Sequence, residues 1–252
     1  MKLTVIILTH NSRGFILDCL NSVKSADEVV IIDDNSTDAT LPIVKKFPVK
    51  VFSRQLENFA AQRNFAVSKA TMPWVLFLDS DERVPLKLFH EIKMVINTDS
   101  YSAYRMKRLN YFFGQAIKHG GYWPDWQTRL FKVKDWQKFT GVIHETPHIS
   151  GRLGSLENHL IHFSHQNLAE GLEKSIIWTK KEAEEFIKAG HPPITWWRIV
   201  KVMVWEFCFR YFKKLGLLDG YVGFIESLIQ AINRFFVYQQ IWELQQDENR
   251  SL

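Results

Sequence analysis

A run of five apolar residues, Trp74 to Leu78, leads directly into two carboxylates, Asp79 and Asp81. An apolar run of this length, preceded by Pro73 and followed by acids, predicts a buried strand of a parallel sheet. Asp79 and Asp81 then lie at the carboxyl end of that strand, where open α/β sheets bind their ligands. Neighbouring carboxylates repel each other unless a cation lies between them, so this pair predicts a site for a hard divalent cation. Without further context, a solvated turn would explain the same residues.

Two earlier segments of the chain follow the same pattern. Residues Leu3–Leu8 run into Thr9–Ser12, and Glu28–Ile32 run into the acidic segment Asp33–Asp38. Apolar residues recur at helical spacing between these strands, as they do at Ile16, Cys19, Leu20 and Val23. Strands that alternate with helices predict an α/β fold with a mostly parallel sheet, and the three polar clusters then share one edge of it.

Length, charge and cysteine content agree with one enzyme-sized α/β domain that has a small appendage. The 252 residues carry a net charge of +5, which favours anionic partners such as phosphates, acidic glycans or an anionic membrane surface. The cysteines, Cys19 and Cys208, lie far apart in apolar helical patterns and predict reduced core residues of a cytoplasmic protein. The segment Met1–Val5 already begins the first strand and lacks the layout of a signal peptide.

In their order and spacing, four motifs of the first 85 residues resemble the family 2 glycosyltransferases, which have a GT-A nucleotide-sugar-binding fold. The matching motifs are Thr9-His10-Asn11, Asp33 to Asp38, Asn58 with Arg63-Asn64, and Asp79-Ser80-Asp81. Looser matches resemble a branch that adds a sugar, often glucose, to the inner core of bacterial lipopolysaccharide. They are Gly114–Pro124, Arg129–Phe131, Gly141–Glu145, and Gly216–Gly220 followed by Gly223.

The resemblance implies a donor site for a nucleotide sugar, most readily a UDP-sugar. In that site Asp34 contacts the nucleobase edge, Asp79 accepts hydrogen bonds from the ribose hydroxyls, and Thr9 and Asn11 line the base pocket. Arg63 faces the diphosphate or the acids. Because arginine matches phosphate and carboxylate geometry, Arg129 is a further candidate contact for the diphosphate or the acceptor, although a surface charge is the plainer interpretation.

The resemblance also implies the catalytic residues. Asp81 and His162 hold a divalent cation, Mg²⁺ or Mn²⁺, and Glu145 is the general base that takes the proton of the acceptor hydroxyl. One displacement without a covalent intermediate then inverts the anomeric carbon. The alternatives are a hydrogen-bonded structural histidine at His162 and a surface acid at Glu145. Structural zinc is weighed because five histidines lie between His144 and His165, but no cysteine lies near them.

The segment from Tyr101 to Asp135 is rich in aromatic and basic residues without a clean period, which predicts a long irregular functional segment. The aromatic residues could stack on sugar faces or cover the sheet edge as core; they are Tyr122, Trp123, Trp126 and Trp136. Aromatic and basic residues together also occur in proteins that bind single-stranded nucleic acid. Nucleic acid is not expected here, because the acidic clusters would repel its phosphates.

The C-terminal third contains a charged helical pattern at Glu170–Lys188 and then helix-breaking residues at Gly190–Pro193. We therefore predict a GT-A domain at 1–190, with a nucleotide-sugar-binding half at 1–100 and an acceptor and catalytic half at 101–165. A helical appendage follows at 191–252. Its first helix has a charge-free stripe edged by lysine and arginine, at Trp197, Val200, Val204, Phe207, Cys208 and Tyr211.

This stripe predicts contact with a membrane interface. The alternative is that the C-terminal helices pack on each other or on a second copy in a homodimer.

The sequence as a whole predicts an inverting, metal-dependent hexosyltransferase that acts on a lipid-linked glycan at the inner face of the cell membrane. One rival is a sugar nucleotidylyltransferase, which would need a glycine-rich phosphate loop where Thr9–Gly14 has one glycine. The other is a non-catalytic module that binds glycans or membranes.

Overall fold

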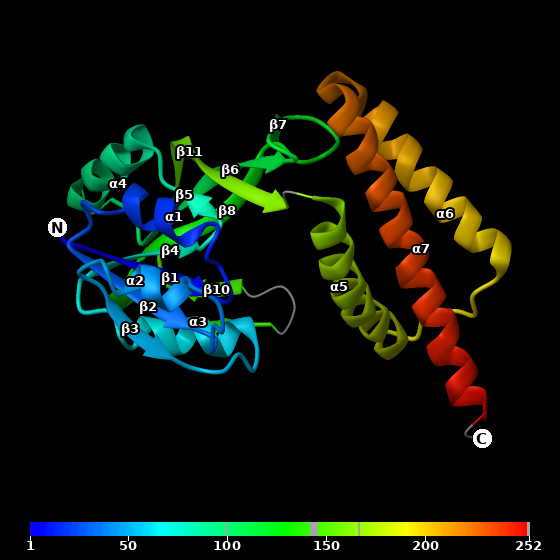
Figure 1. Cartoon of the computed structure of the whole chain (residues 1–252), viewed down its shortest axis with the longest axis horizontal. Coiled ribbons are helices and arrows are strands. Elements are labelled where there is room, and N and C mark those ends of the chain that lie inside the picture. Colours follow the sequence, from blue (N-terminus) through cyan, green and yellow to red (C-terminus); the bar gives the residue numbers. More distant parts are fainter. Residues whose placement is uncertain (99, 142–145, 166, 251–252) are drawn as a thin grey trace. The chain divides into compact units, whose positions relative to one another are not determined.

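The computed structural model describes residues 1–98, 100–141, 146–165 and 167–250. The chain divides into two compact units (Figure 1). The first unit comprises Met1–Leu109 and Asp125–His162, and the second comprises Asn110–Pro124 and Phe163–Leu252. Two long strands, β6 (Ala103–Phe112) and β11 (Leu153–His165), run from the first unit into the second.

The first unit is an α/β unit built around a mostly parallel N-terminal sheet. Its other elements are β1 (Leu3–Thr9), α1 (Ile16–Ser22), β2 (Glu28–Asp33), α2 (Thr40–Val44), β3 (Lys50–Ser53), α3 (Phe59–Val67), β4 (Trp74–Asp79), β5 (Glu82–Arg83), α4 (Leu86–Thr98), β8 (Asp125–Lys132), β9 (Trp136–Thr140) and β10 (Thr146–Ile149). Within the described residues, the main sheet has nine strands: the order is β3-β2-β1-β4-β8-β6-β11-β5, and β7 (Gln115–Ile117) pairs with β6. Strands β1, β2, β3 and β4 are parallel, which confirms the predicted fold class.

Helices cover both faces of this sheet, which is why the sequences of its parallel strands are continuous apolar runs. Val5 and Ile7 of β1 face a core that includes α1 and α4, whereas Ile6 between them faces a core that includes α3. Each fully buried side chain of this size contributes roughly 1.5–3 kcal/mol to folding. The predicted helical residues Ile16 and Val23 are fully buried, so the spacing of α1 alone identified its packed face.

The aromatic segment 101–135 is not irregular, contrary to the prediction. Strands β6 and β8 pair in antiparallel register there, from Ala103↔Phe131 to Arg108↔Asp125. A register shift between Tyr104 and Arg105 breaks the alternation of side chains. A strand with a bulge shows neither a helical period nor a strict period of two, which explains why its pattern was missed.

The second unit consists of a hairpin and three helices. Its elements are β7 (Gln115–Ile117), α5 (Leu168–Lys188), α6 (Trp196–Cys208), a π-helical turn (Phe209–Lys213), a 3₁₀ turn (Gly216–Asp219) and α7 (Gly220–Arg250). Helices α5 and α6 both pack on α7, and the core there includes Ala183, Ile194, Val237 and Ile241.

The glycine-rich motif at 216–223 makes the sharp bend between α6 and α7. A Cβ atom on Gly223 would collide with the carbonyl oxygen of Gly216, so only glycine allows the two turns to approach. Asp219 is buried in the bend and accepts hydrogen bonds from the backbone N–H and the ring Nδ1 of His119, at 2.7 and 2.9 Å. The motif therefore fastens the hairpin at 110–124 to the helices of its own unit.

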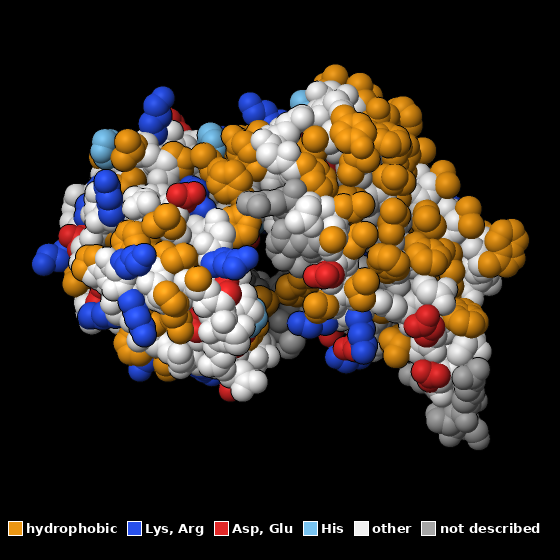
Figure 2. Space-filling model, in the orientation of Figure 1, with side chains coloured by type: hydrophobic (Ala, Val, Ile, Leu, Met, Phe, Trp, Pro, Cys, Tyr) orange, Lys and Arg blue, Asp and Glu red, His pale blue; other side chains and the backbone are white. Residues whose placement is uncertain are grey.

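Helix α6 leaves a broad apolar face exposed (Figure 2). Trp197, Val200 and Val204 of the predicted stripe are 52%, 51% and 57% exposed. Cys208 lies on the same face and is exposed, so its assignment as a core residue was wrong, whereas Cys19 is buried as expected. The helical spacing was right, but the stripe is divided. Its Trp197, Val200 and Val204 face outward, whereas the rings of Phe207 and Tyr211 each lie 5.7 Å from that of Phe224 on α7.

Among the described residues, no individual helix combines the length and hydropathy of a membrane span. The segments Trp196–Lys213 and Gly216–Asp247 meet these criteria as a pair, although they are bent by 70°.

The boundary between the compact units differs from the one expected near residue 190. Helix α5 belongs to the second unit and packs on α7, and the hairpin at 110–124 belongs to it as well. The charged pattern of α5 suggested a solvated helix at the end of the first domain. Its apolar residues, such as Ala183 and Phe186, instead pack in the core of the second unit.

Candidate active site

The three predicted polar clusters meet at one edge of the sheet. Thr9 at the end of β1 pairs in register with Asp33 at the end of β2. On its other side β1 pairs with β4, where Leu8 lies opposite Asp79. Parallel pairing of adjacent strands thus brings together residues that lie 70 positions apart, as the sequence predicted.

Asp33 ends β2 and Asp34 begins the loop after it, and the two acids differ in how deeply they are buried. Asp33 is fully buried and accepts hydrogen bonds from the backbone N–H and hydroxyl of Ser36, at 2.9 and 2.6 Å. Asp34 is 22% exposed; its Oδ1 accepts the Leu56 N–H at 2.8 Å, and its Oδ2 lies 3.7 Å from His10 Nδ1. Asn35 has a φ of 50°, which asparagine tolerates better than most residues. Asp34 is therefore the acid that remains accessible to a ligand.

Thr9 and Asn11, the predicted base-pocket residues, lie beside this loop. The Thr9 Oγ1 is buried and has no hydrogen-bond partner among the described residues. The Asn11 side chain already accepts the Thr37 N–H at 2.8 Å, and its backbone N–H donates to Ser36. Asn11 therefore holds the loop in shape, whereas Thr9 retains a hydroxyl that can serve a ligand.

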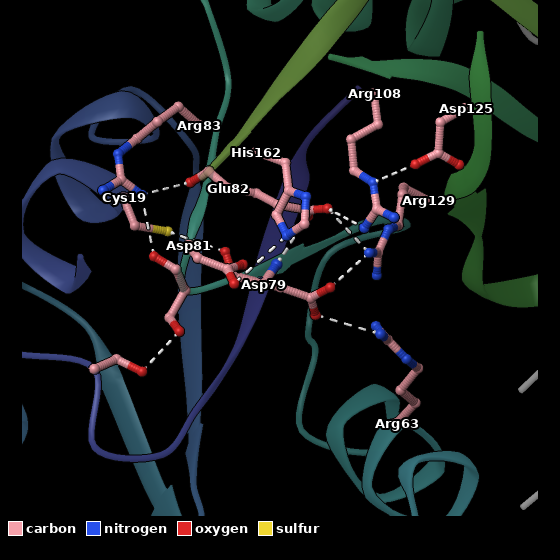
Figure 3. A network of polar contacts seen from close by, with 12 residues as sticks. Cys19, Arg63, Asp79, Asp81, Glu82, Arg83, Arg108, Asp125, Arg129 and His162 are labelled. Carbon is pink, nitrogen blue, oxygen red and sulfur yellow. Dashed lines mark hydrogen bonds and ion pairs between the residues drawn. The ribbon is translucent and has the colours of Figure 1, made fainter. Parts of the chain in front are cut away.

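Asp79 lies between two arginines from different elements (Figure 3). Its Oδ1 accepts a hydrogen bond from Arg63 Nη2 on α3 at 3.3 Å, and its Oδ2 accepts one from Arg129 Nη2 on β8 at 2.6 Å. Both arginines are buried, with 4% and 6% exposed surface. The structure thus brings the predicted residues Arg63, Asp79 and Arg129 together, and arginines rather than a cation balance Asp79.

Glu82 extends this network on the other side of Arg129. Its Oε1 accepts hydrogen bonds from Arg129 at 3.1 Å and Arg108 at 3.2 Å, and its Oε2 accepts the Asp79 N–H at 3.0 Å. Arg108 also donates to Asp125 at 2.8 Å. Glu82 is fully buried, so it fixes the position of Arg129 without solvent screening.

The surrounding arginines decide the protonation of Asp79. Burial by itself raises the pKa of this carboxyl, but Arg129 and Arg63 outweigh it and hold the pKa well below its usual range. For Arg108, burial lowers the pKa, yet the charges of Glu82 and Asp125 outweigh it and the pKa is raised. Asp79 is therefore ionised at neutral pH, with an arginine on each of its carboxylate oxygens.

Asp81 differs from these paired acids. Its Oδ2 lies 3.5 Å from His162 Nε2, on β11, and its Oδ1 is buried without a hydrogen-bond partner among the described residues. Asp79, Glu82 and Asp125 each contact arginine, so Asp81 is the acid of this network whose charge remains available to a cation.

This arrangement fits a divalent cation that shares its ligands with a bound diphosphate. The described residues include no group of three or more His, Cys, Asp or Glu side chains that could hold a metal ion. Mg²⁺ is commonly bound through one or two carboxylates and completes its shell with substrate phosphates and water. Asp81 supplies one carboxylate, with a buried oxygen that has no partner among the described residues, and His162 lies 3.5 Å from its other oxygen.

A cleft of about 220 Å³ lies beside the arginines. Arg63, Arg129, Trp126 and Thr146 are among the residues that line it. Trp126 is 37% exposed, with the Arg105 guanidinium 4.6 Å from its ring centre, so its ring can contact a sugar. The cleft therefore joins positive charge to an accessible aromatic surface.

The other predicted aromatic residues have different environments. Trp136 packs against Phe131 and Phe139 in the sheet core. Tyr122 belongs to the second unit, where its hydroxyl donates to Glu226 at 3.1 Å. Trp123 lies beside it in the same unit. The core interpretation thus holds for Trp136, and Trp126 is the member of the four that lines the cleft.

The predicted base, Glu145, lies outside the described residues, as does His144. The residues on either side of this segment are described: Thr140 of β9 pairs with Thr146 of β10. Since Thr146 lines the cleft, Glu145 is the residue immediately before a cleft residue in the chain. Its role stays a prediction.

Glu82 and Arg108 are the site residues that sequence reasoning missed. Glu82 follows Asp81 directly in the chain, and Arg108 lies in the aromatic and basic segment 101–135, where no role was assigned to it. A usable signal was the excess of arginines around the acids, because buried acids need cationic partners.

Comparison with known proteins gives the same family throughout. The model of the family described as glycosyl transferase family 2 matches residues 4–160. An uncharacterized glycosyltransferase of Rickettsia typhi is 29% identical over 257 residues, covering 96% of this chain and 87% of that protein. The lipopolysaccharide core biosynthesis glycosyltransferase LpsC of Rhizobium meliloti is 24% identical over 252 residues, covering 96% and 93%.

Among solved structures, TarS of Staphylococcus aureus aligns with a TM-score of 0.49 at 18% identity, covering 93% of this chain and 49% of that one.

Proposed function

The chain belongs to glycosyl transferase family 2 and has the GT-A fold, and from that premise we propose that it transfers a hexose from a UDP-sugar to a lipid-linked glycan with inversion. The observation that carries the proposal is Asp81, which follows the carboxyl end of β4 and has a buried carboxylate oxygen without a hydrogen-bond partner in the described residues. Two residues before it, Asp79 contacts Arg63 and Arg129, which line the cleft. Unpaired negative charge next to paired arginines suits a cation and a diphosphate together.

Asp81 and His162 would hold a divalent cation, Mg²⁺ or Mn²⁺. When bound, the cation neutralises the charge of the departing nucleoside diphosphate. Arg129 and Arg63 already carry fixed positive charge at the same edge, and because Glu82 holds Arg129 in place, no reorganisation is needed as charge develops.

The donor's base and ribose would lie over the ends of β1, β2 and β4. A carboxylate accepts hydrogen bonds and donates none, so Asp34 favours a base that presents an N–H group at its edge, as uracil does. Asp79 would accept hydrogen bonds from the ribose hydroxyls, because it stays ionised beside its arginines. Thr9 would supply its unpaired hydroxyl to the base pocket.

The chemical step is a single displacement at the anomeric carbon. The oxygen of the acceptor hydroxyl forms a bond to C1 of the hexose as the bond from C1 to the diphosphate oxygen breaks, and the leaving diphosphate keeps the electron pair. Under the proposal, Glu145 takes the proton of the attacking hydroxyl. Trp126 would pack against the sugar in the cleft and exclude water from one face.

The proposed acceptor is a lipopolysaccharide core or a similar lipid-linked glycan. The relative LpsC is named as a lipopolysaccharide core biosynthesis glycosyltransferase, and the similarity extends over 96% of this chain. The cleft has room for a sugar residue next to Trp126, which agrees with a carbohydrate acceptor.

Thermal stabilisation by nucleotides tests the donor assignment. With Mn²⁺ present, UDP at about one hundred times its Kd should stabilise the protein by ~2.7 kcal/mol, which corresponds to a rise in Tm of roughly 5–10 °C. CDP and GDP at the same concentration should give smaller shifts, and chelation of the metal should reduce the UDP shift. The measurement is a thermal melt with each nucleotide, with and without Mn²⁺.

Hydrolysis of UDP-sugars, followed in the same samples, separates the rival functions. Release of UDP indicates a transferase. Release of UTP from UDP-sugar and pyrophosphate would indicate a nucleotidylyltransferase. If no nucleotide shifts the Tm and no donor is hydrolysed, a non-catalytic binding module is the better account.

Under the same proposal, the protein works at the cytoplasmic face of the membrane, which its lipid-linked acceptor requires. The exposed apolar face of α6 supports this, since Trp196, Trp197 and Trp205 are 79%, 52% and 64% exposed. Lys213 and Lys214 are exposed at the end of the same helix. Tryptophan beside lysine is typical of helices that lie in a membrane interface.

Binding to anionic liposomes tests this membrane contact. Lys213→Glu with Lys214→Glu should weaken sedimentation with phosphatidylglycerol vesicles at least about thirtyfold, because each lysine near the surface contributes about 1 kcal/mol. Arg210 is left unchanged, because it binds Glu206 and the Gly120 carbonyl within its own unit. Binding should also fall at high salt.

A matched control carries the same change of charge on α5, with Lys180→Glu and Lys188→Glu; it should bind liposomes as the wild type does. If the wild type ignores anionic liposomes and forms a dimer that protects α6 from hydrogen exchange, the exposed face is an interface between copies of the chain instead.

A further inference from the structure

The second unit contains a pocket of its own, of about 290 Å³, between α5 and α7. Its lining includes Ser175, Trp178 and Glu182 of α5, which recur at helical spacing, and Gln230, Asn233 and Arg234 of α7. Every residue that lines it belongs to the second unit, so it is a different pocket from the cleft beside Asp79. Facing stripes of two packed helices would normally be apolar, whereas these carry polar and charged side chains among apolar residues such as Ile229 and Val237.

Asn233 is the clearest sign that the pocket receives a ligand. Its side-chain oxygen is buried and has no hydrogen-bond partner in the described part of the chain. More than nine in ten buried polar groups in folded proteins have a partner, so such an atom points to a bound molecule. A leucine of similar shape would pack between the helices without this penalty.

The charge of the pocket does not select for anions. Arg234 and Glu182 form an ion pair at 2.7 Å across the two helices, and their side chains are 33% and 40% exposed. The pair adds no net charge, so it does not favour a phosphate over a neutral molecule. Both groups have further hydrogen-bonding capacity, since a guanidinium has five N–H donors and a carboxylate has four lone-pair sites.

Trp178 gives the pocket an apolar surface. It is 39% exposed, and the Lys181 ammonium lies 4.9 Å from its ring centre. An aromatic surface next to amides, a hydroxyl and a neutral ion pair matches the chemistry of a pyranose ring. Such a ring has an apolar C–H face and a rim of hydroxyl groups that donate and accept.

We propose that this pocket binds a neutral hexose residue at the end of a glycan, with Trp178 against its C–H face and Asn233, Gln230 and the Arg234–Glu182 pair around its hydroxyls. The inference rests on the proposed function in one respect: the glycan would be the acceptor or a branch of it. The second unit would thus recognise a sugar other than the one that reacts.

Binding of methyl glycosides tests the pocket directly. Methyl hexopyranosides of glucose, galactose and mannose, and the matching methyl disaccharides, are titrated by saturation-transfer NMR with excess UDP and Mg²⁺ present. At least one series should bind with a millimolar Kd, and the disaccharide should bind at least as well as its monosaccharide. If no disaccharide binds, the proposal that the sugar is the end of a glycan is wrong. If no glycoside binds at 20 mM, roughly the weakest affinity expected for a single sugar residue, the proposal that the pocket binds a sugar is wrong.

Matched variants locate the binding. Asn233→Leu and Trp178→Ala should each weaken it about tenfold or more. Gln240→Leu is the control for the first, because Gln240 also has a buried side-chain oxygen without a hydrogen-bond partner in the described residues but does not line the pocket. Trp242→Ala, 42% exposed and outside the pocket, is the control for the second. Equal binding by all four variants would place the sugar elsewhere.

Two further measurements distinguish sugar binding by the pocket from a structural role of Asn233 and from failure of the proposed transferase function. Asn233→Leu should melt at or above the wild-type temperature, because it removes a buried amide oxygen that has no hydrogen-bond partner in the described residues. A large drop in Tm would show that Asn233 is structural. UDP-sugar hydrolysis should be unchanged in Asn233→Leu, whereas the KM for a glycan acceptor should rise. Absence of hydrolysis in the wild type would count against the proposed function and leave the glycoside titration, which needs no turnover, to decide the pocket.

Discussion

Asp81→Ala should reduce glycosyl transfer at least about a thousandfold and remove the part of UDP binding that depends on Mn²⁺. The reason is that Asp81 has a buried oxygen without a hydrogen-bond partner in the described residues, while Asp79, Glu82 and Asp125 are held by arginines. The variant should still fold, since it loses a carboxylate whose Oδ1 has no hydrogen-bond partner in the described residues. The measurement is transfer rate and UDP affinity, each with and without Mn²⁺.

The matched control is Asp18→Asn, which neutralises a 73% exposed carboxylate of α1 in the same unit. It should retain normal transfer. If Asp81→Ala keeps near-normal turnover in metal-containing buffer after treatment with a chelator, the cation does not act through Asp81. His162→Ala should show the same metal-dependent loss in weaker form, because it removes one neutral ligand and no charge.

Glu145→Gln should lower the rate of transfer by roughly 10²–10⁴-fold, the usual contribution of a general base, and leave donor affinity unchanged. Glutamine keeps the shape of glutamate but does not accept the proton of the attacking hydroxyl. The residue precedes Thr146, which lines the cleft with Arg63 and Arg129. Single-turnover rates and UDP-sugar affinity, measured in parallel, check the prediction.

Glu185→Gln, an exposed acid of α5, is the control and should change neither quantity. A second check is the pH profile: the acidic limb of the transfer rate should report a group in the wild type that is missing in Glu145→Gln. Weaker donor binding with little change in rate would instead assign Glu145 to the donor site.

The parallel strands, and the polar motifs at their carboxyl ends, were predictable because both depend on local patterns in the sequence. Continuous apolar runs at β1, β2 and β4 require burial on both faces, and parallel pairing then brings Thr9, Asp33 and Asp79 to one edge. The packed face of α1 followed in the same way from its spacing. The approach of Arg63 to the acids was also expected, and the structure confirms that placement.

Partners of buried charges were not predictable in the same way. Sequence patterns placed a cation between Asp79 and Asp81, whereas the fold brings Arg129 from β8 and Arg63 from α3 onto Asp79. The contact between Arg129 and Asp79 depends on the antiparallel pairing of β4 with β8. These strands lie about 50 residues apart in the chain, and neither contains a local pattern that predicts the other as its neighbour. The role of Glu82 was missed for the same reason, because its partner Arg129 also comes from β8.

What the sequence by itself determined is the set of strands, helices and polar strand ends, because hydrophobic spacing decides which face of each element is buried. What only the tertiary structure decided is which neighbour each face meets. The stripe of α6 was correctly predicted to be apolar, yet its residues from Trp197 to Val204 face outward, whereas Phe207 and Tyr211 contact α7. Helix α5, predicted to be solvated, lies against α7 and lines a pocket. Helical spacing specifies a face, but the partner of that face depends on long-range packing, which no local pattern encodes.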